Sequence, residues 1–125
     1  SIGMIILYLS AIFWTLGYDT IYGAQDMSDD EIIGIKSTSI KFKNNIKSFV
    51  TTSYLLFLSM IIYLFINDIG KNFFTFFLLF LIVNLIYQLR KFNILEPKSC
   101  LIAFKSNNLS GLLLFLAILS IDFKL

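Results

Sequence analysis

Acidic side chains gather in one short segment of this 125-residue chain. Five of its eight acidic residues lie within positions 19–31. If the segment is helical, Asp19, Asp26 and Asp30 share one face with Tyr22, because residues four and seven apart lie on the same side of an α-helix. Neighbouring carboxylates repel one another, and Mg²⁺, which prefers oxygen ligands, commonly binds one or two carboxylates together with substrate phosphates. The spacing suits Mg²⁺ bridging to a diphosphate, and a solvated acidic loop is the alternative.

The residues around this stripe add a cation and hydroxyl groups. Asp29 and Glu31 project to its flanks on a helical projection. Gly34 can end an acidic helix, and Lys36 with the hydroxyls of residues 37–39 then follows about two turns from the carboxylates. A cation at this place could neutralise a phosphate, whereas the hydroxyls could equally cap the next helix.

The composition restricts the class of protein that carries this segment. Hydrophobic residues make up 58% of the chain and charged residues 14%, and the mean hydropathy is +0.83. Soluble domains have about 45–50% and about 25%, so an ordinary soluble globule and a disordered tail are excluded. The net charge of +2 is too small and dispersed for a nucleic-acid surface. Without histidine, Ser-His-Asp triads are excluded as well, and the single cysteine, Cys100, is expected to be structural.

Four uncharged stretches mark the expected membrane spans. They cover residues 2–18, 48–67, 72–89 and 106–121. A bilayer requires about 20 residues of apolar helix, with a range of about 17–25. The first stretch is therefore at the short limit and the last is below it. Backbone polar groups in hydrocarbon must be satisfied within the segment, and the stretches lack the alternation of a barrel strand. We expect an all-α integral membrane bundle of four transmembrane helices.

The basic residues predict how the bundle is oriented. Eight of the ten lie in residues 19–47 and 90–105, and only Lys71 and Lys124 fall on the opposite side. By the positive-inside rule, both long loops, and the acidic segment with them, are expected to be cytoplasmic. The expected spans contain no ionisable residue, which argues against the ion pathway of a transporter.

Two sequence motifs point to a known family. The run YDTIYGAQDMSDDEIIGIKSTSIKF at positions 18–42 resembles the second aspartate-rich motif of the UbiA-type aromatic prenyltransferases, and most closely that of the bacterial 4-hydroxybenzoate polyprenyltransferases of ubiquinone biosynthesis. The run CLIAFKSNNLSG at positions 100–111 resembles the loop before the last helix of that family. The resemblance implies that residues 1–125 are the C-terminal portion of one transmembrane domain, with the last four helices of a nine-helix fold, in the bacterial inner membrane.

The same resemblance implies a division of roles among the site residues. Asp26 and Asp30 would bind the Mg²⁺ cofactor. Asp19 would orient the ligands around this ion or face the acceptor. Lys36 would help neutralise the diphosphate that leaves polyprenyl diphosphate, and 4-hydroxybenzoate would accept the prenyl group. The first aspartate-rich motif of the family, NDxxDxxxD, is absent from this sequence. We therefore expect the chain to need a missing N-terminal half and to be inactive alone.

Aromatic and amide side chains near the spans have alternative roles. Tyr18 and Tyr22 could offer aromatic faces to an allylic cation, or they could be ordinary tyrosines of a membrane boundary. Asn107 and Asn108 begin the last span, where capping is expected and contact with a diphosphate or headgroup is the alternative.

A different class of function also fits the composition. A small four-helix membrane scaffold, or a cation-binding subunit, could bind Mg²⁺ or Ca²⁺ through the acidic loop without catalysis. An upstream reading frame that encodes the first aspartate-rich motif would favour the prenyltransferase.

Overall fold

The structure, a computed structural model, describes residues 1–25, 46–70, 72–93 and 96–121. Within these ranges every regular element is a helix, apart from one isolated bridge between Asn93 and Glu96. The elements are α1 (Ile2–Gln25), α4 (Ile46–Leu64), the short 3₁₀ helix η1 (Ile66–Asp68), α5 (Phe73–Lys91), α6 (Pro97–Lys105) and α7 (Asn107–Ile121). The expected all-α fold is confirmed.

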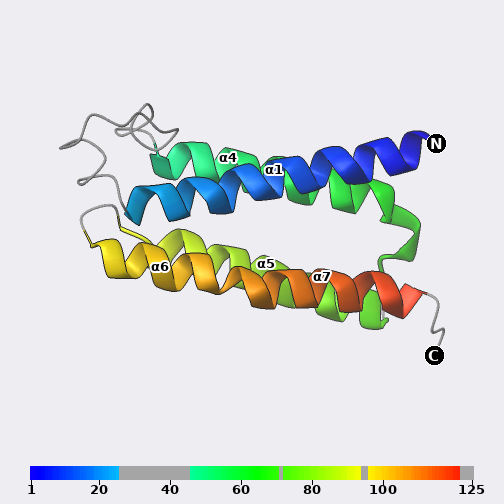
Figure 1. Cartoon of the computed structure of the whole chain (residues 1–125). Helices are drawn as coiled ribbons and strands as arrows, with labels where there is room; N and C mark the ends of the chain where they lie inside the picture. The colour runs from blue at the N-terminus through cyan, green and yellow to red at the C-terminus, as the bar shows by residue number, and fades with distance from the viewer. Residues whose placement is uncertain (26–45, 71, 94–95, 122–125) are drawn as a thin grey trace.

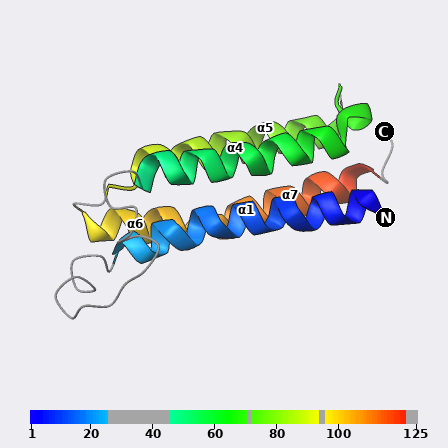
Figure 2. The same cartoon turned by 90° about the horizontal axis from the view of Figure 1, so that it is seen from above.

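The helices form a bundle of two antiparallel pairs. α1 packs along α4, α5 packs along α7, and α6 lies against both α1 and α5. α6 and α7 follow one another almost end to end and together run the length of the bundle (Figure 1). Seen from above, α4 and α5 form one side of the bundle, and α1, α6 and α7 form the other (Figure 2).

Four helical segments are long and apolar enough to cross a membrane: Ile2–Ala24, Ile46–Leu64, Phe73–Lys91 and Pro97–Ile121. The first helix runs beyond the expected span to Gln25, so it contains Asp19. The expectation that the spans contain no ionisable residue is therefore wrong for this helix, and the other three candidate spans also include ionisable residues: Lys47, Arg90, Lys91, Lys98 and Lys105. The difference arises because helical hydrogen bonding in α1 continues beyond residue 18, where the expected span ends.

The last span also differs from the sequence expectation. Residues 97–105, expected within a loop, form α6, with Pro97 in its first turn. Proline is favoured there because the first backbone N–H groups of a helix lack intrahelical partners. α6 thus gives a short apolar stretch the length of a full membrane span. At the opposite end of the bundle, α5 begins after Asn72, whose side chain accepts a hydrogen bond from the Thr75 backbone N–H at 2.9 Å.

The two expected cytoplasmic loops leave from the same end of the bundle. α1 and α5 end there, and α4 and α6 begin there. The N-terminus, η1 and the end of α7 lie at the opposite end (Figure 1). Lys47 stabilises this end, because its Nζ donates to the Phe92 carbonyl at 3.0 Å and lies 4.7 Å from the centre of the Phe92 ring.

The orientation of this end gives a first prediction. Reporter fusions at Lys43 and at Lys98 should both report a cytoplasmic location, since eight of ten basic residues belong to these two segments. A fusion after Lys71 serves as the control and should report the opposite side. An outward signal at Lys43 or Lys98 would contradict the four-span topology.

A close contact between α1 and α4 depends on Gly17. A Cβ atom at this position would lie 2.7 Å from Tyr54 Cδ1 and closer still to Cε1. The Tyr54 ring is 1% exposed, so it has little room to move. Gly17 therefore allows the backbone of α1 to approach the ring of a fully buried residue.

Gly17→Ala should lower the free energy of unfolding by about 1–3 kcal/mol, the usual cost of overfilling a packed core. Gly3→Ala is the matched control, because its Cβ would lie 3.8 Å from Leu64 Cδ2 and alanine favours helix over glycine. Unfolding in detergent, followed by circular dichroism, measures both. Equal stability of the two variants would contradict the close packing.

Candidate active site

Only part of the predicted carboxylate stripe lies within the described residues. Asp19 and Tyr22 lie on the last turns of α1, and both are exposed. Asp26, Asp30 and Lys36 lie outside the described residues, as do the flanking Asp29 and Glu31. In the part of the chain that is described, no three His, Cys, Asp or Glu side chains come together to hold a metal. The predicted magnesium site therefore stays a prediction.

Aromatic side chains form a continuous series beside Asp19, here called the aromatic ladder. Trp14, Tyr18 and Tyr22 are four residues apart on α1 and so share a face. Trp14 stacks on Phe57 of α4 with ring centres 5.8 Å apart and meets Tyr18 edge-on at 5.4 Å. Phe104 of α6 contacts Tyr18 at 6.0 Å and Tyr22 at 4.7 Å. The ladder leads from the interior to the end of α1 at which the acidic segment begins.

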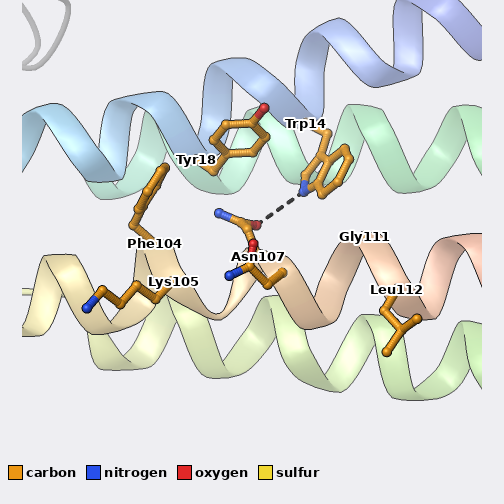
Figure 3. A pocket seen from close by; sticks show the side chains of 8 residues that line it. Trp14, Tyr18, Phe104, Lys105, Asn107, Gly111 and Leu112 are labelled. Carbon is orange, nitrogen blue, oxygen red and sulfur yellow. Dashed lines mark hydrogen bonds between the residues drawn. The ribbon is translucent and has the colours of Figure 1, made fainter.

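A cavity of about 420 Å³ opens beside the ladder, between α1 and the junction of α6 with α7. Figure 3 shows Trp14 and Tyr18 on one side of it and Asn107 on the other. Lys105 and Asn108 also line it. The volume falls in the range of small-molecule sites, which are mostly apolar with a few polar groups. Aromatic walls, one cation and two amides are suited to an unsaturated molecule with an acidic head.

Buried amides behind the cavity form a hydrogen-bonded cluster, here called the amide network. Its hub is Gln88 of α5, which is 0% exposed. Gln88 Oε1 accepts from the Tyr54 hydroxyl at 2.6 Å. The two N–H groups of Nε2 are shared among three acceptors: Asn84 Oδ1 at 2.9 Å, Ser110 Oγ at 3.0 Å and Asn107 Oδ1 at 3.1 Å. The Ser110 hydroxyl also donates to Asn84 Oδ1. The network joins α4, α5 and α7 inside the bundle.

Asn107 connects the amide network to the cavity. Its Oδ1 accepts a second hydrogen bond from Trp14 Nε1, at 3.3 Å, across the space shown in Figure 3. Its side-chain bonds therefore run to Trp14 and Gln88, and none of the described bonds makes it the cap of α7. The capping expectation thus fails for Asn107, because two buried donors compete for the same oxygen. The expectation for Cys100 agrees with its burial and with its Sγ lying 3.4 Å from the Asn93 carbonyl oxygen.

Sequence reasoning missed Tyr54, Asn84 and Gln88. A signal for them exists, because amides in an apolar span seldom face lipid and Asn84 and Gln88 lie four residues apart on one face. Which helices they join depends on packing, which no spacing within one helix shows.

The chain matches the UbiA prenyltransferase family over residues 1–119. It is 35% identical over 113 residues to the mitochondrial 4-hydroxybenzoate polyprenyltransferase of Bos taurus, covering 90% of this chain and 30% of that protein. It is 39% identical over 116 residues to the enzyme of the same name from Dictyostelium discoideum, covering 90% and 24%. With 4-hydroxybenzoate geranyltransferase 2 of Lithospermum erythrorhizon, identity is 37% over 114 residues, covering 90% and 37%.

These matches extend over most of this chain but over a minor part of each relative. The chain spans 24–37% of the length of the three relatives named. No solved structure gives a significant match. The resemblance drawn from positions 18–42 and 100–111 is confirmed, and the chain belongs to the UbiA prenyltransferase family.

Proposed function

We propose that this chain is the C-terminal part of a Mg²⁺-dependent membrane enzyme that transfers a polyprenyl group from polyprenyl diphosphate to 4-hydroxybenzoate. The family match over residues 1–119 carries the proposal. The names of the similar proteins from Bos taurus and Lithospermum erythrorhizon support the acceptor, since both specify 4-hydroxybenzoate. The fold supports a membrane-bound reaction, because four helical segments are able to span a bilayer.

The carboxylates would act at the end of α1. Asp19 is exposed there, and Asp26 follows directly after the last residue of the helix, Gln25. Asp26 and Asp30 would hold Mg²⁺, and the oxygen donors of carboxylates fit this ion. When bound, Mg²⁺ supplies positive charge to a diphosphate leaving group. Lys36 would add a cation of this chain's own to the same group.

The aromatic ladder would act on the other side of the breaking bond. Loss of diphosphate leaves an allylic cation, and an aromatic face within about 6 Å attracts a cation by about 2 kcal/mol or more when water is excluded. Tyr18 is half-buried between Trp14 and Phe104, so its ring is at the edge of a partly dry space. Tyr22 is 44% exposed and lies three residues after Asp19 on α1. These rings would stabilise the cation until the aromatic acceptor attacks.

The cellular setting is part of the proposal. The positive-inside count favours an orientation with both long loops cytoplasmic. The resemblance to bacterial enzymes of ubiquinone biosynthesis supports a bacterial inner membrane, where the product would enter that pathway. The relatives from Bos taurus and Dictyostelium discoideum are mitochondrial by name. A multi-pass membrane location is common to both settings.

The test is prenyl transfer in membranes that contain the chain together with an N-terminal half carrying the first aspartate-rich motif. Membranes receive polyprenyl diphosphate and 4-hydroxybenzoate, and prenylated 4-hydroxybenzoate is measured by mass spectrometry. We expect product with Mg²⁺ and none after chelation with EDTA, with recovery when Mg²⁺ is added back. Membranes with the N-terminal half alone are the control. Absence of product in the complete mixture would favour a scaffold or a cation-binding subunit instead.

A further inference from the structure

One face of α1 is left largely uncovered by the rest of the described chain. α1 packs mainly against α4 and α6, and Gly17 meets the ring of Tyr54 at the contact with α4. On a helix of 3.6 residues per turn, the side opposite Gly17 carries a row of residues spaced three or four apart. This surface, here called the outer face of α1, consists of Met4, Tyr8, Ile12, Thr15 and Asp19.

The outer face of α1 is open along most of its length. Met4 is 73% exposed and Tyr8 is 70% exposed, and Ile12 and Asp19 are exposed as well. α1 is also the least buried of the four candidate spans, with 11% of its apolar stretch buried against 33% for α4 and for α5. In a membrane, either lipid or another protein surface must cover this face.

Asp19 makes lipid a poor partner for the outer face. It lies six residues before Gln25, the last residue of α1, and falls inside a candidate span. Ionisable side chains within spans almost always face protein or a water-filled space. Lysine and arginine reach the headgroups with long side chains, whereas a carboxylate on a short side chain lacks that reach and is repelled by anionic lipids. The end of the face that carries Asp19 is therefore expected to meet a polar group from outside the described chain.

The outward side of α5 differs from the outer face of α1 in this respect. Its exposed residues follow a similar spacing but are apolar until they end in a cation: Phe76, Leu79, Val83, Ile86 and Arg90. Arg90 lies near the end of α5, at the same end of the bundle as Asp19 (Figure 1). A cation there suits the anionic headgroups, so the outward side of α5 has the pattern of a lipid-facing surface.

We propose that the outer face of α1 is the docking surface for the N-terminal half of the enzyme, and that an apolar helix of that half lies along it with a hydrogen-bond donor level with Asp19. The inference rests on the proposed function for the existence of that half. The three relatives named above contain enough additional chain for it, because this chain spans 24–37% of their length. A second copy of this chain fits less well. A two-fold axis along the membrane normal would bring two Asp19 carboxylates to the same depth, where they repel one another.

Photo-cross-linking identifies the molecule that covers each face. The photoreactive residue p-benzoylphenylalanine replaces Met4 or Tyr8 on the outer face of α1, or Val83 or Tyr87 on the exposed side of α5. Each chain is co-expressed with the N-terminal half, the membranes are irradiated, and the products are separated by mass. We expect cross-links to the N-terminal half from Met4 and Tyr8 and none from the two positions on α5, which would contact lipid.

Ile12→Trp tests whether a helix packs closely on the outer face. The larger ring would separate α1 from an apposed helix but can be accommodated by lipid, so most of the N-terminal half should no longer co-purify with the chain. Val83→Trp is the matched control and should leave co-purification unchanged. In the chain without its partner, Ile12→Trp should unfold like the wild type when followed by circular dichroism, because Ile12 is exposed there. This measurement separates loss of docking from loss of folding.

The proposal would be overturned if neither α1 position cross-linked to the N-terminal half, or if Tyr8 cross-linked to a second copy of the chain instead. Cross-links from α5 as strong as those from α1, or equal co-purification of Ile12→Trp and Val83→Trp, would also contradict it. The assay for prenyl transfer tests the proposed function separately. Cross-links from α1 in membranes that form no prenylated product would support this surface and contradict the proposed function, whereas product without the cross-links would do the reverse.

Discussion

Replacing Asp26 or Asp30 by asparagine is expected to lower the rate of prenyl transfer by about 10²–10³-fold in the reconstituted enzyme. Asparagine keeps the volume of the side chain but removes the charge that would hold Mg²⁺ at the leaving diphosphate. Losing one stabilising group for charge that develops in a transition state costs roughly 2.7–4 kcal/mol, which corresponds to this factor. The same variants should require more Mg²⁺ to reach half of their maximal rate.

The matched controls are Asp29→Asn and Glu31→Gln, which change charge in the same segment but off the stripe. A solvated surface charge contributes well under about 1 kcal/mol, so these variants should retain most of the rate. Measuring the rate against Mg²⁺ concentration for all four variants separates loss of the metal from loss of a surface charge. If the flanking variants lose as much as the stripe variants, the stripe is not a continuous helical face and its ligands must be reassigned.

Asp19 shows why the sequence predicted the kind of fold well and its limits less well. The charge-free stretch at positions 2–18 predicts a span, but helical hydrogen bonding continues through Asp19 to Gln25. A carboxylate at the end of a helix is tolerated where polar surroundings begin. The uncharged stretch is therefore shorter than the helix that contains it. α6 has the same explanation, because Pro97 begins a helix within a segment whose lysines suggest a loop.

The amide network shows where sequence reasoning stops. An apolar span hides Asn84 and Gln88. Gln88 bonds to Ser110 and Tyr54, which are 22 and 34 positions away, and Asn84 bonds to Ser110, 26 positions away. Their alignment depends on how α4, α5 and α7 pack, and no periodicity within one helix contains that information. The motif at positions 100–111 did indicate Asn107, yet as a cap. Only the structure brings its amide between Trp14 and Gln88.

The purified 125-residue chain is expected to form no prenylated 4-hydroxybenzoate above the level of a protein-free sample. The proposed mechanism needs carboxylates from two aspartate-rich motifs to hold one diphosphate through Mg²⁺, and this sequence contains one such motif. The relatives are consistent with a longer enzyme, since the match with the Bos taurus protein covers 30% of its length. With carboxylates from only one motif, the chain would hold Mg²⁺ at the diphosphate more weakly, and the barrier to breaking the allylic C–O bond would remain high.

Loss of folding would give the same negative result, so the measurement includes unfolding of the same sample followed by circular dichroism. A helical chain that unfolds in one cooperative transition but makes no product is folded and lacks groups that the reaction needs. Adding the N-terminal half to that sample should then restore transfer, because the second set of carboxylates would complete the metal site. Turnover by the purified chain alone would contradict the fragment hypothesis, since one aspartate-rich motif would then suffice to activate the diphosphate.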